Sequence, residues 1–413
     1  MKKRLLVLLL AAPLLFFNAC TKKKGCMDPA STSFNEEAEE DDGSCTYPED
    51  PTTIKVTANV TANTTWKAGK TYILTTRVAV VSGVTLTIEP GTVIKGDAGT
   101  GANATALIIA RGAKIMAEGT AAKPIIFTSV ADKIEPGQIK SPNLDETFNS
   151  LWGGLLVMGK APISADAESV QIEGIPASDQ NGLFGGTDAT DNSGVIKYVS
   201  IRHGGANIGE GNEINGLTLG GVGSGTVIDH VEIVGNQDDG IEFFGGTVNV
   251  SNLLVWNAGD DAIDTDQSWS GTLDNFIVIS AGDELFELDG GEGTSAGTHT
   301  IKNGTVYGGV CQGLADLDND ITKTVENSNV IMENIYFFGI SETVKPDFDD
   351  KPAQATLTNF QVTLPGTVVI TDLFKKGSDA AVTAVALGAN TVGADASVFS
   401  WTMANAHSAL VGF

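Results

Sequence analysis

The sequence is poor in basic residues and in cysteine. Its 413 residues include 25 Lys and Arg against 51 Asp and Glu, which gives a formal net charge of −26. A nucleic-acid-binding protein needs basic surface to neutralise phosphates, so this class of partner is excluded. Four cysteines in a chain of this length exclude a scaffold held together by many disulfides. The chain also lacks a phosphate-binding loop, a dinucleotide fingerprint, an HExxH zinc motif and a nucleophile elbow.

Glycine and short apolar runs are abundant instead. Gly accounts for 49 residues and hydrophobic residues for 42% of the chain, which is enough for an extended core. From residue 54 onward, runs rich in β-branched residues alternate with Gly, Asn and Asp, and no stretch keeps a helical period. Examples are VTLTI at 84–88, IIFT at 125–128 and LLVM at 155–158. These runs predict a β-rich main body with many tight turns.

The N-terminus has the features of an export signal. Basic residues at 2–4 precede an apolar run at 5–17, which is too short to span a bilayer comfortably. Cys20 directly follows Ala19, and this ending resembles the lipobox of bacterial lipoproteins. The resemblance implies that 1–19 is a signal peptide and that Cys20 is acylated; the alternative is an ordinary signal peptide with an incidental cysteine. We therefore expect a cell-envelope protein anchored to the outer membrane through acyl chains alone, on either its surface or its periplasmic face.

A small acidic segment follows the proposed anchor. Residues 25–45 read GCMDPASTSFNEEAEEDDGSC, which resembles a short Cys-bracketed module found in secreted and surface proteins of Gram-negative bacteria. The resemblance and an exported location imply a disulfide between Cys26 and Cys45. The clustered carboxylates are either Ca²⁺ ligands or a solvated spacer. With the linker that follows it, this module makes up residues 20–53.

The main body is built from repeats. Apolar segments align at a common third residue, and their spacings fit a coil of about 22 residues with loop insertions. A second column, which starts at Asp238 and ends at Cys311, keeps the same offsets of 22, 23 and 28 residues. Two columns that shift together indicate a solenoid whose stacked coils share one core. The aligned segments are IKYVSI at 196–201, IDHVEI at 228–233, VSNLLV at 250–255, LDNFIV at 273–278, IKNGTV at 301–306, MENIYF at 332–337 and LTNFQV at 357–362.

These repeats resemble the right-handed parallel β-helix of pectate lyases. With RHGG at 202–205 and DDGIEFFGG at 238–246, they also resemble a family of uncharacterised bacterial β-helix lipoproteins. The resemblance implies an all-β solenoid over residues 54–413, in which stacked Asn side chains form a structural ladder. The residues 393–413 are then expected to cap the last coil, because a solenoid needs its open edge covered. The proposed ladder consists of Asn252, Asn275, Asn303 and Asn334.

The same register predicts a column of like charges. If Ile241, Ile263 and Phe286 point inward, alternation places the acidic residues beside them on the outer face, about 5 Å apart on adjacent coils. Carboxylates so close repel one another, so they hold protons, bind a divalent cation or meet a cationic partner. Oxygen ligands of this kind suit Ca²⁺, although a solvated acidic stripe is the alternative. The predicted calcium ligands are Glu242, Asp261, Asp264, Asp266, Glu287 and Asp289.

A catalytic interpretation of the same surface is also possible. Asp264 and Asp266 alternate on one strand, about 6.8 Å apart, within the range that an inverting glycosidase requires. His203 is the best isolated candidate for a reactive group, but the register places its neighbour Arg202 in a different column from the acids. We therefore expect a binding or structural protein that contacts glycans or envelope proteins, with Ca²⁺ as its ion. The alternative is a polysaccharide hydrolase or lyase.

Overall fold

The computed structural model divides the chain into two compact units, residues 1–51 and residues 52–413. It describes residues 22–47, 52–176, 178–208, 213–319, 325–349 and 351–413. The signal peptide predicted at 1–19 and the lipidated Cys20 lie outside the described residues. The observed boundary is two residues before the predicted start of the solenoid at residue 54.

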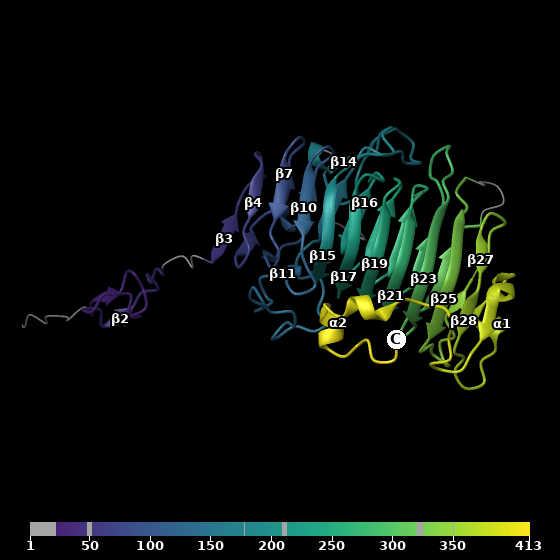
Figure 1. Ribbon diagram of the computed structural model, residues 1–413. Coiled ribbons are helices and arrows are strands. Elements are labelled where there is room, and N and C mark those ends of the chain that lie inside the picture. Colours follow the sequence, from purple (N-terminus) through teal and green to yellow (C-terminus); the bar gives the residue numbers. More distant parts are fainter. Residues whose placement is uncertain (1–21, 48–51, 177, 209–212, 320–324, 350) are drawn as a thin grey trace, which may run out of the picture. The chain divides into compact units, whose positions relative to one another are not determined.

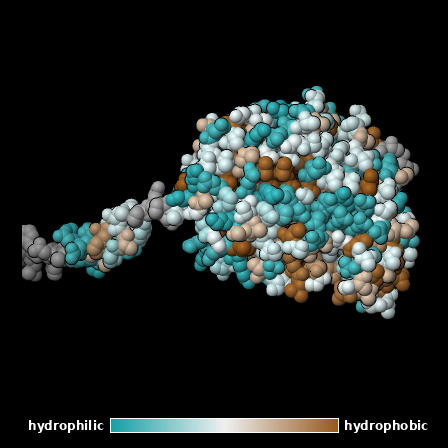
Figure 2. Space-filling view, viewed as in Figure 1, coloured by the Kyte–Doolittle hydropathy of each residue, from teal (hydrophilic) through white to brown (hydrophobic). Residues whose placement is uncertain are grey.

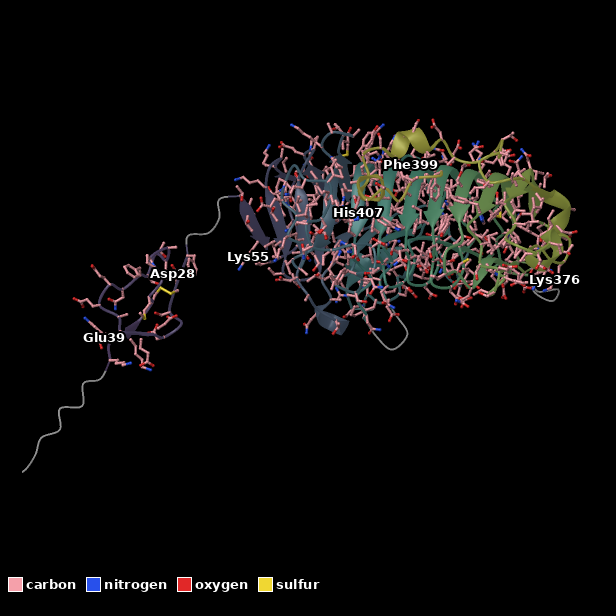
Figure 3. All side chains as sticks on the ribbon, turned by 90° about the horizontal axis from the view of Figure 1, so that it is seen from below. Asp28, Glu39, Lys55, Lys376, Phe399 and His407 are labelled. Carbon is pink, nitrogen blue, oxygen red and sulfur yellow. A yellow bond between two sulfur atoms is a disulfide. The ribbon has the colours of Figure 1, made fainter. Side chains whose placement is uncertain are left out.

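The first unit is the small acidic module. Its strands β1 (Lys24–Gly25) and β2 (Glu40–Asp41) pair in parallel, and a disulfide joins Cys26 to Cys45, which confirms the predicted pairing. The disulfide appears as a yellow bond in Figure 3. Asp28, Asp41 and Asp42 each accept a hydrogen bond from the backbone N–H two residues further along. These carboxylates therefore shape turns, as short Asx motifs do.

The second unit is a parallel β-helix, as Figure 1 shows. Its larger sheet has sixteen strands among the described residues, and these strands pair in parallel. The strands of this sheet are β3 (Thr53–Val56), β4 (Thr64–Trp66), β5 (Thr71–Leu74), β7 (Thr85–Ile88), β8 (Val93–Gly96), β10 (Lys114–Glu118), β11 (Ile125–Ser129), β15 (Gly194–Arg202), β17 (Val227–Val234), β19 (Asn249–Trp256), β21 (Thr272–Ile279), β23 (His299–Tyr307), β25 (Val330–Phe338), β27 (Thr356–Thr358), β28 (Phe360–Val362) and β29 (Val382–Ala384).

The second long sheet closes each coil from the other side. It contains nine strands among the described residues, in the same coil order as the larger sheet, and it positions the acidic residues. The strands are β6 (Val78–Val80), β9 (Leu107–Ile109), β12 (Leu155–Met158), β16 (Leu217–Gly220), β18 (Ile241–Phe244), β20 (Ile263–Asp266), β22 (Phe286–Leu288), β24 (Gly313–Leu317) and β26 (Asp347–Phe348).

The long strands of the sixteen-stranded sheet bend at one residue each. β15 pairs with β10 on one side of Tyr198 and with β11 on the other side. Tyr198 and the residues stacked on it have φ between 49° and 60°, in the left-handed region that Asn enters more readily than most residues. This conformation explains why the repeated slot favours Asn. The bend residues are Tyr198, His230, Asn252, Asn275, Asn303, Asn334 and Asn359.

The side chains at the bend form a chain of hydrogen bonds. Asn275 donates to Asn252 at 2.6 Å, and Asn334 donates to Asn303 at 3.1 Å. Asn359 extends the column by donating to Asn334 at 2.7 Å. Between Asn275 and Asn303 the direct link is replaced, because Asn303 donates to Asp274 at 2.7 Å. The four predicted ladder residues therefore stack, in two hydrogen-bonded pairs.

One apolar core fills the interior of the coils. It runs from Val60 to Phe374 and contains the inward residues Ile241, Ile263 and Phe286, each fully buried. Burial of such side chains stabilises the fold by about 1.5–3 kcal/mol each. A second cluster lies outside the nine-stranded sheet, where the insertion 159–193 packs on β9 and β12 through Ile172, Ile175 and Phe184. That insertion carries β13 (Val170–Gln171), η2 (Gln180–Gly182) and β14 (Leu183–Phe184).

The C-terminal segment 393–413 does not cap the last coil, contrary to expectation. Residues around α1 (Ile370–Leu373) close that end, since Leu373 and Phe374 join the main core. The segment runs back across the outer side of the sixteen-stranded sheet, where α2 (Met403–Ala406) lies beside β17 and β19 (Figure 1). The described helices, which include η1 (Gly101–Asn103), η3 (Ser378–Ala381) and η4 (Ala396–Phe399), are single turns; none has the length or apolar character to cross a membrane.

Contacts at successive coils hold this segment in place. Ala394 N–H donates to Thr305 Oγ1 at 2.8 Å, and Asp395 N–H donates to Asn275 Oδ1 at 2.7 Å. Further back, Met403 and Ala404 donate their N–H groups to the buried carboxylate of Glu232, at 3.0 and 2.9 Å. In the space-filling view, hydrophobic residues gather along the lower edge, where the segment and the last coils lie (Figure 2). Figure 3 shows Phe399 and His407 over the same strands.

Candidate functional site

The acidic residues form a continuous column on the nine-stranded sheet. Glu242, Asp264 and Glu287 occupy equivalent positions on β18, β20 and β22, and Asp316 on β24 continues the column. Their chain neighbours Ile241, Ile263 and Phe286 point into the core, so alternation directs the acids outward. The column has a closed end, near β18, and an open end, near β22 and β24.

Three carboxylates converge at the closed end. One oxygen atom from each of Asp239, Glu242 and Asp264 lies within 4.8 Å of the other two. Asp239 and Glu242 are only 7% and 6% exposed. The amide of Asn215 contacts Glu242 through Nδ2, whereas its buried Oδ1 has no hydrogen-bond partner among the described residues. We call Asp239, Glu242, Asp264 and Asn215 the closed acidic site.

Loops cover the closed acidic site from outside. Residues from the insertion and from the loop before β16 line a small crevice over Leu156 and Thr218, and Thr218 is the register neighbour of Glu242. Asn236 fixes the turn that carries Asp239, because its Nδ2 donates to the carbonyl oxygens of Ile214 and Asp239 at 3.1 and 2.8 Å. The acids here are therefore withdrawn from solvent, unlike the hydrated stripe considered from sequence.

A second acidic column precedes these strands. Asp261 N–H donates to Asp239 Oδ1 at 3.0 Å, and Glu284 N–H donates to Asp261 Oδ1 at 2.6 Å. Each carboxylate thus accepts the backbone of the next coil. Burial, followed by a hydrogen bond with Glu287, raises the pKa of Asp261 to about 11. Asp261 therefore keeps its proton at neutral pH.

Ionised carboxylates are unfavourable in the closed acidic site when no cation is bound there. Burial, followed by the charge of Asp264, raises the pKa of Glu242 well above its ordinary value. The pKa of Asp264 is raised by burial and then by Glu287, and that of Asp239 by burial and then by Asp264. Without a cation these groups retain protons, whereas a divalent cation would replace the protons and satisfy several oxygens at once.

The open end of the column is a pocket of about 550 Å³. Asp266 and Asp289 lie on its wall, one residue beyond the paired positions Thr265 and Leu288. Burial, followed by the charge of Glu292, raises the pKa of Asp266 to about 7. Burial, followed by the charge of Asp318, raises the pKa of Asp289 to about 8. The pocket is lined by Asp166, Asp266, Asp289, Gly290, Gly291, Glu292, Asp318 and Glu326.

The six predicted calcium ligands are therefore divided among three settings. Glu242 and Asp264 meet in the closed acidic site, Asp261 pairs with Glu287, and Asp266 and Asp289 line the pocket. Sequence reasoning did not select Asp239 as a ligand, although it belongs to an acidic column that the repeat reveals. Asn215 has no counterpart in the repeat, so nothing in the sequence singles it out.

The structure does not bring His203 to the acids, in agreement with the separate column that the repeat predicts for its neighbour Arg202. His203 follows β15 of the other sheet and is fully buried, with Nδ1 2.8 Å from the carbonyl oxygen of Phe148. Arg202 is also buried, and its Nε donates to Ser200 Oγ at 2.7 Å. Arg202 pairs in register with Val234, as the repeat predicts. Both side chains act in packing.

The tryptophans beside the acidic coils are buried as well. Trp269 stacks on Phe243 with ring centroids 3.9 Å apart, and its Nε1 donates to the carbonyl oxygen of Val248 at 3.0 Å. Trp256 packs edge-on against His407 of the C-terminal segment. Neither ring is presented for stacking on a sugar.

The fold and its outward acidic column define a parallel β-helix protein with an acidic outer face. The sequence model of the pectate-lyase-like β-helix domain matches residues 58–406. The chain therefore belongs to the pectate-lyase-like β-helix family. No curated protein and no solved structure matches it significantly.

Proposed function

We propose that this protein is a Ca²⁺-binding, glycan-contacting protein of the cell envelope, attached to the membrane through Cys20. The observation that supports the ion is the convergence of Asp239, Glu242 and Asp264 within 4.8 Å, withdrawn from solvent. Asn215 adds a buried carbonyl oxygen that has no partner in the described part of the chain. Carboxylate and amide oxygens are the ligands that Ca²⁺ prefers.

The geometry favours a divalent cation over ionised acids alone. Isolated charges of one sign are costly to bury, so Asp239, Glu242 and Asp264 must either keep protons or neutralise a cation. Ca²⁺ tolerates irregular coordination, which suits carboxylates from two coils and an amide from a loop, whereas Mg²⁺ demands near-octahedral geometry. An exported location would supply the ion.

Glycan contact is supported by the family and by the adjoining pocket. The pectate-lyase-like fold fits a protein that contacts or acts on polysaccharides. The open pocket beside the closed acidic site presents polar groups on a rigid sheet, and its size lies in the range of small-ligand sites. The proposed location in the cell envelope is based on the signal peptide expected at residues 1–19.

Calorimetric titration tests the ion. Metal-stripped protein at pH 7.5 is titrated with CaCl₂ and, separately, with MgCl₂; we expect binding of Ca²⁺ in preference to Mg²⁺. The double variant Glu242→Gln/Asp264→Asn should weaken Ca²⁺ binding at least about tenfold, because two anionic ligands become neutral.

Glu118→Gln is the matched control. Glu118 is an exposed acid on β10 of the other sheet, so its loss removes one negative charge, against two in the double variant, and leaves the closed acidic site intact. An equal effect of both variants, or no heat with Ca²⁺ in the wild-type protein, would refute the proposed ion. Glycan contact is tested by affinity electrophoresis with neutral and acidic polysaccharides.

A second candidate function, glycoside hydrolysis, is favoured by one observation. Asp266 and Asp289 line the same pocket, with pKa values of about 7 and about 8, so one can donate a proton beside an ionised neighbour. Asp264, which the sequence paired with Asp266 as the second catalytic carboxylate, belongs to the closed acidic site. Release of reducing ends from a glycan panel, abolished by Asp266→Asn, would favour hydrolysis over binding alone.

A further inference from the structure

The insertion 159–193 and the turn after β9 enclose another pocket, of about 280 Å³. Two basic side chains, Arg111 and Lys160, line it together with Glu168 and Asp188. It shares no residue with the acidic column of the nine-stranded sheet. Sites for drug-sized ligands occupy about 300–1,000 Å³, so a pocket of this size suits a single sugar or a similar small molecule. We call it the insertion pocket.

Lys160 is held at its backbone but not at its ammonium group. Its N–H donates to the buried carboxylate of Asp191 at 3.1 Å, and its carbonyl oxygen accepts the N–H of Asp188 at 2.9 Å. The Nζ atom lies over Gly112, 2.8 Å from the point that a Cβ atom would occupy there. It has no hydrogen bond or ion pair in the described part of the chain. The position of this charge is therefore set by the fold, while the charge itself is not used by the fold.

A lysine beside acids in this solenoid can pair with them. Lys197 on the larger sheet contacts Asp229 of the next coil at 2.8 Å. Lys160 lines one pocket with Glu168, yet among the described residues neither of these side chains forms an ion pair. A ligand that lies between an ammonium group and a carboxylate can contact both of them, with an anionic group on one side and a hydrogen-bond donor on the other.

Arg111 brings the second cation to the pocket. Its Nη1 donates to the carbonyl oxygen of Gly185 at 2.9 Å, which fixes the guanidinium group at the pocket wall. Gly185 has a φ of 91°, and a Cβ atom there would lie 2.7 Å from the carbonyl oxygen of Glu168, so this contact requires glycine. The described part of the chain gives Arg111 no other side-chain hydrogen bond. Its remaining N–H groups are therefore available to a ligand.

The charges of the pocket indicate the class of ligand. A carboxylate carries one negative charge and can be satisfied by one guanidinium group, whereas a phosphate monoester carries about −1.5 to −2 near neutral pH and three acceptor oxygens. Arg binds such oxygens through its planar fork and Lys binds them as a point charge, so Arg111 and Lys160 together suit a phosphate. Glu168 and Asp188 would repel a bare anion. The rest of the ligand must therefore bring donors, such as hydroxyl groups.

We propose that the insertion pocket binds a phosphorylated sugar, with its phosphate on Arg111 and Lys160 and its hydroxyl groups on Glu168 and Asp188. Two sources share this chemistry: a free sugar phosphate and the phosphorylated sugar of a membrane lipid. The proposal goes beyond the calcium site. It uses none of the residues of the closed acidic site, and it does not depend on Ca²⁺.

The test is calorimetric titration of the full mature chain in EDTA, so that no cation on the acidic column can bridge to a phosphate. Glucose 6-phosphate, glucuronate, inorganic phosphate and glucose are titrated separately. We expect glucose 6-phosphate to bind most tightly, glucuronate and phosphate more weakly, and glucose not to bind. No binding of glucose 6-phosphate, or equal binding of glucose 6-phosphate and any of the other three, would overturn the proposal.

Vesicles distinguish the two sources. Cys20→Ser removes the expected lipid anchor, and this variant is sedimented with phosphatidylcholine vesicles that contain or lack lipid A, a phosphorylated glucosamine lipid. Sedimentation that requires lipid A and that glucose 6-phosphate reverses would identify the lipid. Titration with glucose 6-phosphate but no sedimentation would identify a free sugar phosphate. Sedimentation with lipid A that glucose 6-phosphate does not reverse would contradict a shared site.

One substitution then locates the binding. Lys160→Gln should weaken the binding of glucose 6-phosphate about tenfold or more, because a charge-assisted hydrogen bond is lost. Its melting temperature should not change, since the ammonium group has no partner in the described part of the chain. Lys114→Gln is the matched control, because Lys114 is exposed on β10 of the other sheet and its loss removes the same charge. An equal loss in both variants would show attraction to net charge alone and would overturn the proposal.

A second substitution tests the contact with the sugar. Glu168→Ala removes a negative charge and an acceptor from the pocket, so inorganic phosphate should bind at least as tightly as in the wild type. The preference for glucose 6-phosphate over phosphate should decrease, because a hydroxyl group loses its acceptor. An unchanged preference would contradict the proposed position of the sugar.

The two proposals fail separately. Glu242→Gln/Asp264→Asn should lose Ca²⁺ and retain glucose 6-phosphate, whereas Lys160→Gln should retain Ca²⁺ and lose glucose 6-phosphate. If the wild-type protein binds glucose 6-phosphate only when Ca²⁺ is present, the phosphate binds the metal and the proposed role of the insertion pocket is wrong.

Discussion

The bend column and the acidic column stack residues at the same coil spacing, with opposite electrostatic results. In the bend column Asn275 donates to Asn252 and Asn359 donates to Asn334, so most stacked amides satisfy a neighbour, and Asn303 donates to Asp274 where the direct link is absent. In the acidic column Glu242, Asp264 and Glu287 are equally regular, yet an ionised carboxylate only accepts hydrogen bonds. A column of amides therefore completes itself, whereas a column of carboxylates requires protons or an external cation.

The two columns should differ most in how their contribution to stability depends on pH, and here we expect the largest effect. The pKa values of Asp266 and Asp289 are about 7 and about 8 in the fold, against 3.8 ordinarily. The folded state thus holds protons on these two groups that the unfolded chain has released, so their contribution to stability is greatest below about pH 4 and is lost as pH rises through the folded values. Urea unfolding without divalent ions should show a decrease on the order of 5 kcal/mol between about pH 4 and pH 8. A flat profile would contradict the protonated acidic column.

Breaking the amide column gives the next largest effect. Asn275→Val places a β-branched residue at a φ of 60° and removes the hydrogen bonds to Asn252 and Asp395. The free energy of unfolding should decrease by about 3 kcal/mol, from backbone strain and from lost hydrogen bonds. Asn275→Gly is the control, because it accepts the left-handed conformation and loses only the amide. It should cost about 1 kcal/mol; equal losses would exclude the backbone contribution.

Ca²⁺ should offset the repulsion between the carboxylates of the acidic column mainly at high pH, where they are ionised. At pH 8, Ca²⁺ at about 100 times its dissociation constant should raise the free energy of unfolding by about 2.7 kcal/mol. EDTA should reverse the gain. At pH 5, where protons compete for Glu242 and Asp264, the gain should be much smaller. A gain of equal size at both pH values would indicate binding elsewhere.

Exchanging the two chemistries gives the smallest and most direct effect. Glu242→Gln should stabilise the metal-free protein at pH 8 by about 1 kcal/mol, because it supplies a donor and removes a charge. Asn334→Asp should destabilise it by a similar amount, because Asn303 loses its donor. Urea unfolding of both variants in EDTA measures the pair. If both variants change the free energy of unfolding in the same direction, the position of the side chain, and not its ability to donate a hydrogen bond, determines the effect.

The repeat was sufficient to predict the register. The alignment of Asn252 with Asn275, and of Glu242 with Asp264, is observed in the paired strands. These predictions succeed because coils of similar length force residues about 22 apart into contact, and because an inward apolar residue fixes the face of its neighbour. The Cys26–Cys45 disulfide followed from the module itself.

What was not predicted comes from segments outside the repeat. The insertion 159–193 has no counterpart in other coils, so its position over the acidic column could not be derived from periodicity. The division of that column into a closed site with Asn215 and an open pocket depends on this insertion and on single loops. The C-terminal segment 393–413 was expected at the last coil because a solenoid has an open edge to cover. The aromatic side chains of Phe399 and Trp401 indicate a covering segment but not which surface it covers.

The route of that last segment has a consequence for biogenesis. The C-terminal segment is synthesised after every coil. It covers Glu232, Leu254 and Ile277, which lie on the outer side of the larger sheet. The coils can thus form in order from the N-terminus while a strip of apolar side chains and one buried acid still face water. Until residues 393–413 are made, the nascent protein exposes this apolar strip, and a holding chaperone could bind it there.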